Sequence, residues 1–395
     1  MSLAPWVELE AESGSWIRKM YREGQRLTAE FGVDKVADLS IGQPLEVSPA
    51  VRQAFETAAN EDFAGRFGYM PNSGYPELRE RCAEDVNFAV SPRGVVVTSG
   101  AAGAIALALR AFVESGREIL ALAPYFPEFR LYATVLGSPF AAVPRGPGAG
   151  VNLEALAAAL SPNTGALILN SPSNPSGHVL THAELSSIAE LLEAHNRRHN
   201  RRVLLVVDEV YRRIIYTPAT HIEALAHYET TVLARSFSKD LGIAGERIGY
   251  LVLHPSLASA EAERGLELCA RALGFVNASA TAQRALLALD DWRIDLTPYT
   301  ERRSLILDAV RSAGIEAVAP DGGIYLWARS PWNDTLAYVN HLARQRVLVT
   351  PGVAFGDETH FRICFTARFK ALELTREVLS LADGTTAERA PQPEP

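Results

Sequence analysis

The feature that most constrains this chain is a series of short apolar runs, separated from one another by stretches with a helical pattern. The runs occupy residues 95–98, 118–122, 166–169 and 203–207. A continuous apolar run of this length is typical of a strand buried on both faces, as in a parallel sheet. Between two of them, residues 181–199 begin with Thr181 and Glu184 at the spacing of a helical capping box. The alternation predicts a large, doubly wound and mostly parallel α/β domain.

The last third of the chain has a different pattern and predicts a smaller α+β domain. Residues 291–314 have a helical period, in which Pro298 marks a start or a kink. We expect residues 1–45 to join this smaller domain, residues 46–285 to form the large domain and residues 286–382 to complete the small one. Residues 383–395 are rich in Pro, Glu, Thr and Ala, a composition that predicts disorder.

Composition excludes several classes of function. A formal net charge of −8 argues against a general nucleic-acid binder, which normally carries a basic face. Three scattered cysteines, without metal-ligand spacing, argue against a disulfide framework and a metal site. Neither a signal peptide nor a membrane-spanning run is visible, so we expect a cytoplasmic enzyme that binds neither membrane nor nucleic acid.

The stretch with the most chemistry is Ser236-Phe237-Ser238-Lys239, which is followed by Arg247. A lone lysine is usually a solvated surface residue. A lysine among cationic or desolvating neighbours can instead lose its proton and attack a carbonyl, forming a Schiff base. The two hydroxyls and the guanidinium suit a phosphate. An aldehyde that carries a phosphate would satisfy the whole stretch.

Residues 236–249 read S-F-S-K-D-L-G-I-A-G-E-R-I-G, and this string resembles the pyridoxal-phosphate lysine signature of the class I/II aminotransferases, which are fold type I, aspartate aminotransferase-like enzymes. Glu246 stands where many members carry Trp. The resemblance implies pyridoxal 5'-phosphate bound to Lys239, a phosphate held by Ser236, Ser238 and Arg247, and a seven-stranded sheet. Similar strings occur in register from about residue 40 to about residue 365.

Polar and small residues follow the predicted strands, and ligands of doubly wound sheets bind at the carboxyl ends of the strands. A helix start of small residues exposes backbone N–H groups that suit a phosphate, although it also suits tight packing. A flat aromatic ring can stack on a pyridine, and an acid at the end of a buried strand needs a cationic partner. The residues concerned are Ser99, Gly100, Ala101, Ala102, Phe126 (rather than Tyr125), Asn174, Asp208 and Tyr211.

The resemblance gives these residues roles. It assigns residues 99–102 to the cofactor phosphate and Phe126 to stacking on the pyridine ring. It assigns Asn174 and Tyr211 to the phenolic oxygen and Asp208 to the ring nitrogen, which Asp208 would keep protonated.

Three more strings match elements of the same family. Gly42, in a Gly-x-Pro turn, would contact the substrate carboxylate through its backbone, although Leu45 replaces the acid that often follows the proline. Tyr69, in Y-x-P-x-x-G-x-x-E-L-R, would reach the cofactor phosphate of the neighbouring subunit, which implies a homodimer. Arg362, in R-I-x-F, would clamp the substrate carboxylate, although an arginine inside a strand can also pair with a structural acid.

The function implied is ping-pong transamination between an L-amino acid and a 2-oxo acid. Lys239 would move the proton as general acid and base, assisted by Asp208 and Tyr211. Two further reactions on the same cofactor stay open, namely β-elimination by a C–S lyase and cyclisation of an amino acid. Selectivity would depend on residues 16–19, on Ile41 and on the partner's loops. The sequence shows no second arginine that must bind an acidic side chain, so the substrate is not predicted.

Overall fold

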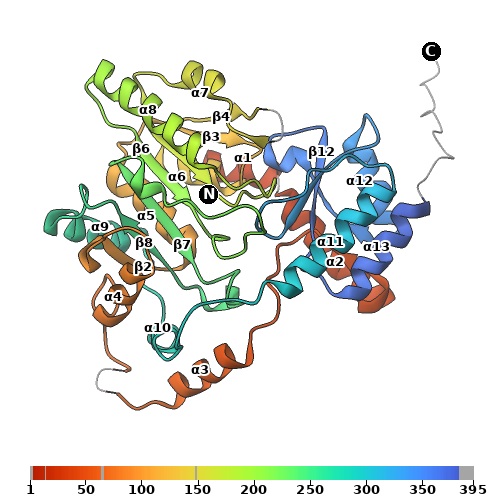
Figure 1. The fold of residues 1–395 in the computed structure, drawn as a ribbon, viewed down its shortest axis with the longest axis horizontal. Helices are drawn as coiled ribbons and strands as arrows, with labels where there is room; N and C mark the ends of the chain where they lie inside the picture. The colour runs from red at the N-terminus through yellow and green to blue at the C-terminus, as the bar shows by residue number, and fades with distance from the viewer. Residues whose placement is uncertain (1–2, 14, 64–65, 147–148, 382–395) are drawn as a thin grey trace.

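The computed structural model describes residues 3–13, 15–63, 66–146 and 149–381, so the predicted tail at 383–395 lies outside the described residues. A seven-stranded sheet forms the centre of the larger domain (Figure 1). Its order β2-β8-β7-β6-β5-β3-β4 has β8 antiparallel to both neighbours, while the other pairings are parallel. The strands are β2 (Val95–Thr98), β3 (Glu118–Ala123), β4 (Phe140–Pro144), β5 (Thr164–Asn170), β6 (Leu204–Asp208), β7 (Thr231–Ser236) and β8 (Gly249–Leu253). The predicted doubly wound, mostly parallel sheet is confirmed.

Helices cover both faces of this sheet because its strands are apolar on both sides. One face packs against α3 (Pro49–Asn60), α4 (Pro76–Glu84), α7 (Leu153–Ala159), α8 (His182–His199) and α10 (Ala280–Leu287). The other packs against α5 (Gly100–Phe112), α6 (Glu128–Leu136) and α9 (Ala260–Leu273). The predicted capping box is present at the start of α8, where the Thr181 and Glu184 side chains each bond the other's backbone.

The smaller domain has its own core, contains the carboxyl-terminal helices and lies to the right of the large sheet in Figure 1. Its strands are β9 (Tyr325–Arg329), β11 (Thr350–Pro351) and β12 (His360–Cys364) in the antiparallel order β11-β12-β9, and β1 (Ala37–Asp38) parallel to β10 (Val347–Leu348). Its helices are α2 (Trp16–Phe31), α11 (Thr297–Ser312), α12 (Thr335–Arg344) and α13 (Phe369–Leu381). Met20 and Leu27 of α2 are buried in this core. The exact domain boundaries stay predictions.

Two details extend or correct the expected elements. The helix expected over residues 291–314 begins only at Thr297, because Pro298 occupies its first turn, where the missing N–H has no intrahelical partner to lose. Short 3-10 helices connect other elements, namely η1 (Val33–Lys35), η2 (Pro92–Gly94), η4 (Ala224–Ala226), η5 (Ala244–Glu246) and η6 (Gly352–Phe355).

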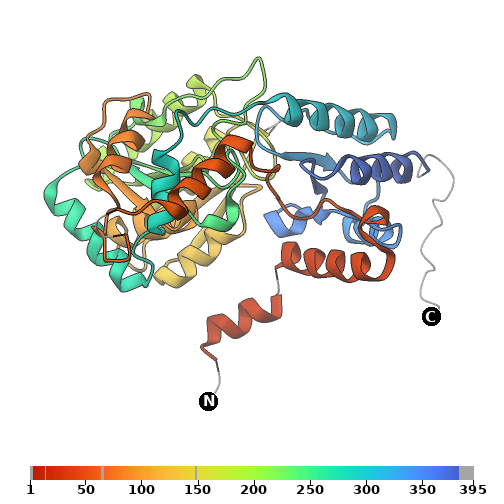
Figure 2. The same cartoon turned by 90° about the horizontal axis from the view of Figure 1, so that it is seen from below.

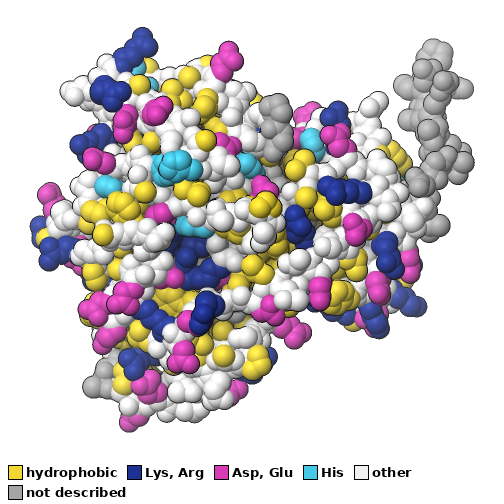
Figure 3. All heavy atoms as spheres, viewed as in Figure 1, with side chains coloured by type: hydrophobic (Ala, Val, Ile, Leu, Met, Phe, Trp, Pro, Cys, Tyr) yellow, Lys and Arg dark blue, Asp and Glu magenta, His cyan; other side chains and the backbone are white. Residues whose placement is uncertain are grey.

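The first helix, α1 (Pro5–Ser13), stands off from the body of the chain in Figure 2. Its Glu10 accepts a 2.7 Å hydrogen bond from Arg130 of α6. On the face drawn in Figure 3, basic and acidic side chains are interspersed. Within the described ranges, none of the helices is long and apolar enough to cross a membrane.

Candidate active site

A cavity of about 340 Å³ lies at the carboxyl ends of the central strands. Adjacent parallel strands bring Asn170, the last residue of β5, into register with Asp208, the last residue of β6. The Asn170 side chain donates to the backbone oxygen of Asp208 at 3.0 Å and accepts from the backbone N–H of Asn174 at 2.6 Å. These bonds fix the loop that carries Asn174, so the ends of β5 and β6 both contribute to one cavity, as the sheet rule predicts.

Lys239 lies three residues beyond the end of β7 and points into the cavity, where its Nζ donates to the backbone oxygen of Gly42. Burial, reinforced by the positive charges of Arg362 and Arg247, lowers the pKa of the amine to about 8. A lysine with this pKa has a substantial neutral fraction near neutral pH, and the neutral amine is the nucleophile.

Asp208 is buried at the same edge of the sheet, with 5% of its surface exposed. Burial raises the pKa of its carboxyl to about 7, and the neighbouring charge of Glu209 acts in the same direction. Among the described residues, the one hydrogen bond that its carboxyl accepts comes from the backbone N–H of Val210 at 3.3 Å. Within the described part of the chain no lysine, arginine or histidine forms an ion pair with it. Such a carboxyl is suited to a cationic ligand.

A cradle for an anion lies on the other side of the cavity. Helix α5 begins at Gly100, whose φ of +70° favours glycine, and a Cβ there would lie 2.8 Å from Arg247 Nη2. Ser236 Oγ donates to Ser238 Oγ at 2.9 Å, and both hydroxyls line the cavity. Unpaired N–H groups of a helix start, two hydroxyls and an exposed guanidinium form a donor set that suits a phosphate.

Arg362 is 1% exposed and lies where the smaller domain meets the large sheet. Its Nη1 donates to Asn174 Oδ1 at 2.8 Å, and its Nη2 donates to the backbone oxygen of Ser40 at 2.6 Å. The guanidinium stacks on the rings of Tyr325 and Phe355, with centroids 4.2 and 4.7 Å away. No carboxylate of the described residues pairs with it, and its Nε has no partner there. The structural-acid alternative for this arginine therefore has no support among these contacts.

Of the aromatic residues named from the sequence, some line the cavity and others do not. Phe126 lines the cavity. The ring of Tyr125 is not among the lining residues and packs on Phe140 at a centroid distance of 4.9 Å, while its backbone N–H donates to the backbone oxygen of Phe355. Tyr211 is buried and donates to Tyr325 Oη at 3.1 Å. Tyr69 does not line this cavity, and its side chain is fully exposed, at 109% of the reference area.

Gly42 is required here by close approach rather than by its φ. A Cβ on Gly42 would collide with the Tyr325 hydroxyl. Ser99, Ala101 and Ala102 lie at the start of α5, and the last two line the cavity.

Several lining residues carried no signal that sequence reasoning used. Tyr325 contacts Gly42, Tyr211 and Arg362, yet it follows an ordinary Gly-Gly turn. Asn170 ends an apolar run, so the rule that ligands meet strand ends could have included it. Glu128 and Tyr132 of α6 also line the cavity, as do Ile17, Arg18 and Ile41, which lie within or beside the segments expected to set selectivity.

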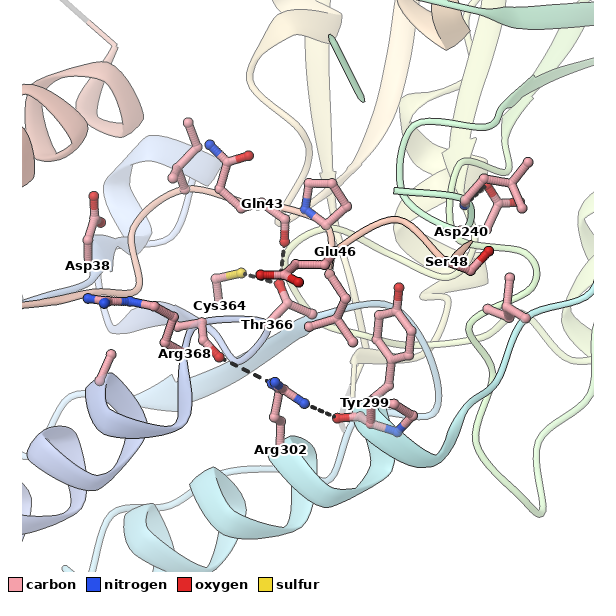
Figure 4. Close-up of a pocket in the computed structure, with 18 of the residues that line it drawn as sticks. Asp38, Gln43, Glu46, Ser48, Asp240, Tyr299, Arg302, Cys364, Thr366 and Arg368 are labelled. Carbon is pink, nitrogen blue, oxygen red and sulfur yellow. Dashed lines mark hydrogen bonds between the residues drawn. The ribbon is translucent and has the colours of Figure 1, made fainter. Parts of the chain in front are cut away.

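A second cavity, of about 660 Å³, lies on the other side of the segment that contains Gly42 (Figure 4). There Thr366 donates to the backbone oxygen of Gln43, and Arg302 Nε donates to the backbone oxygen of Ala367 at 3.2 Å. The segment is therefore anchored on both sides, by Lys239 in one cavity and by Thr366 in the other.

Comparison with known proteins agrees with the chemistry that the geometry of the cavity suggests. The family model described as aminotransferase class I and II matches residues 34–379. A valine–pyruvate aminotransferase of Mycobacterium tuberculosis is 31% identical over 333 residues, which cover 81% of this chain and 83% of that protein. A probable aspartate aminotransferase of Methanocaldococcus jannaschii is 27% identical, with 86% and 92% covered. An aminotransferase structure from Eubacterium rectale superposes with a TM-score of 0.89 at 25% identity, covering 97% of this chain and 98% of that one. The chain therefore belongs to the class I and II aminotransferases, a family that depends on pyridoxal 5'-phosphate.

Proposed function

We propose that the cavity binds pyridoxal 5'-phosphate and transfers an amino group between an L-amino acid and a 2-oxo acid by a ping-pong mechanism. The observation that carries the proposal is that one cavity contains both a buried lysine of lowered pKa, Lys239, and a buried carboxyl without a cationic partner, Asp208. Those are the two groups that an aldehyde on a basic ring needs.

The donor set fits this cofactor. The phosphate would lie against the start of α5 (residues 99–102), with Ser236, Ser238 and Arg247 as further donors. Phe126 would stack on the ring, and Asn174 and Tyr211 would face its phenolic oxygen. Asp208 would lie at the ring nitrogen and Lys239 at the aldehyde carbon. When bound, the cofactor supplies an electron sink for the bond at Cα of the amino acid.

The protein's own groups perform the remaining work. Arg362 and the Gly42 backbone would hold the α-carboxylate, which places Cα near Lys239 Nζ. The amine of Lys239 would take the proton from Cα and deliver it to the aldehyde carbon of the cofactor. Its pKa of about 8 suits this role near neutral pH. Asp208, as an anion beside the ring nitrogen, would keep that nitrogen protonated.

A single-turnover experiment tests the proposal. The enzyme saturated with pyridoxal phosphate is mixed with a panel of L-amino acids without any 2-oxo acid, and the cofactor absorption and the product are measured. Transamination predicts one equivalent of 2-oxo acid per site and restoration of the absorption band by a second 2-oxo acid. Continuous release of a 2-oxo acid and ammonia would favour the lyase alternative, and a heterocyclic product would favour the cyclase. Lys239→Ala should abolish turnover.

We also propose a homodimer in which Tyr69 reaches the phosphate site of the partner. Two almost fully exposed aromatic side chains two residues apart, Phe67 and Tyr69, support this arrangement, because apolar side chains that are grouped on a surface suit a protein–protein contact. The protruding helix α1 could contact a partner in the same way. Size measurement in solution, together with Tyr69→Phe, which should weaken cofactor binding, tests it. A cytoplasmic location stays a prediction from the sequence.

A further inference from the structure

The cavity has lining residues beyond those assigned to the cofactor and the α-carboxylate. Beyond them it is lined by Ile17 and Arg18 of α2 and by Glu128 and Tyr132 of α6. These residues have no role in the proposed transfer step. They are therefore available to the side chain of the substrate.

Glu128 is the unusual member of this group. It is the first residue of α6, and an acid at a helix start normally lies in water, where it complements the helix dipole. Here Oε2 is buried and has no hydrogen-bond partner among the described residues. A buried acceptor without a donor is unfavourable, and native proteins seldom keep one unless a ligand or water supplies the donor.

Burial and the neighbouring charges act on the Glu128 carboxyl in opposite directions, and burial has the larger effect on its pKa. Burial raises the pKa of this carboxyl, while the positive charges of Arg18 and Arg362 and its own backbone N–H act in the opposite direction. Arg362 already donates to Asn174 and Ser40 and would bind the α-carboxylate under the proposed function. Arg18, exposed on α2, is the remaining cation that faces Glu128.

We propose that Glu128 selects the substrate, favouring an amino acid whose side chain ends in a hydrogen-bond donor, with a primary amide as the best match. An amide would donate its NH₂ to the Glu128 carboxylate and present its oxygen to Arg18. A side-chain carboxylate would instead bring a second negative charge to Glu128 and has no proton to donate. This inference rests on the proposed function, and it separates the chain from relatives named aspartate aminotransferases.

Direct binding tests the inference without any turnover. The holoenzyme is titrated with succinamate, succinate and butanoate, measured by calorimetry. Each has one carboxylate for Arg362, and they differ only at the far end, which is an amide, a carboxylate or a methyl group. We expect succinamate to bind about tenfold or more tightly than succinate, the range of one hydrogen bond to a charged group. Tighter binding of succinate by the wild-type enzyme would overturn the inference.

The variant Glu128→Gln removes the charge and keeps the shape. We expect it to lose the preference for succinamate and to bind succinate more tightly than the wild type does. Glu154→Gln on α7, an exposed position with the same change of charge, should leave both affinities unchanged. An unchanged preference in Glu128→Gln would overturn the assignment. If Glu128→Gln does not fold, the wild-type comparison of the three ligands still decides.

Single-turnover rates separate this inference from the proposed function. L-asparagine should react faster than L-aspartate with the wild-type holoenzyme, and Glu128→Gln should narrow or reverse that ratio of rates. If neither amino acid nor any other changes the cofactor band, the proposed function fails. If both react and aspartate is preferred, transamination stands and the role of Glu128 is refuted.

Discussion

Asp208→Asn should stabilise the cofactor-free protein at pH 8, although it removes a residue of the active site. The pKa of Asp208 is about 7, against an ordinary value of 3.8, because the carboxyl is buried without a cation. The folded protein therefore keeps this proton to a higher pH than the unfolded chain does. Stability falls as the pH rises from about 4 to about 7, and above pH 7 the loss is complete.

The size of the effect follows from the gap between the two pKa values. A gap of about three pH units corresponds to a loss of up to about 4 kcal/mol above pH 7. Asparagine is neutral at every pH and keeps a side-chain oxygen for the Val210 N–H, so the variant avoids the loss. Below about pH 4 both side chains are neutral in both states, and the difference should vanish.

Urea unfolding of the cofactor-free protein at pH 4 and pH 8 measures the difference. Asp308→Asn on α11, an exposed position, is the matched control and should change little at either pH. Lower stability of Asp208→Asn than of the wild type at pH 8 would refute the reasoning, because it would mean that the carboxylate has a favourable partner in the empty protein. Addition of pyridoxal phosphate should make the wild type more stable than Asp208→Asn, since the ring cation can pair with the aspartate of the wild type but not with the asparagine of the variant.

Three further predictions concern Lys239, Arg362 and Thr366. The rate at which the cofactor-free protein reacts with pyridoxal phosphate should rise with a midpoint near pH 8, because the neutral amine of Lys239 reacts; a midpoint above 10 in a pH–rate series would contradict its burial. Arg362→Lys should reduce kcat/KM by about 10²-fold or more, since it loses a bidentate donor and leaves Asn174 Oδ1 without its donor; steady-state kinetics measures this. Thr366→Val removes the donor to the backbone oxygen of Gln43 and should cost about 1 kcal/mol of unfolding free energy. Because this bond anchors the segment that contains Gly42, the variant should also raise KM more than it lowers kcat.

The sequence predicts those parts of the site that depend on strand ends. Apolar runs locate the strands, and parallel strands must end at a common edge, so Asp208 and the loop of Asn174 are expected to meet. Lys239 is indicated by the chemistry of its neighbours and follows the end of β7 by three residues. Resemblance adds Arg362, which lies in the smaller domain. Glu128 and Tyr325 were not predicted, because each lies in an ordinary local context and gains its position only when α6 and β9 pack against the cavity.

Arg362 also shows why chemistry read from residue types alone underestimates the cost of binding. In the structure this guanidinium is already engaged by Asn174 and Ser40, and only Nε is without a partner. A substrate carboxylate that takes a bidentate position must use Nε together with a donor that now serves one of these oxygens. The free energy of binding is then the difference between two sets of hydrogen bonds, not the full strength of an arginine–carboxylate pair. Ser40 lies in the segment that contains Gly42, and Asn174 follows β5 of the large domain. A substrate that takes a donor of Arg362 away from Ser40 or Asn174 therefore also changes the contact between the two domains.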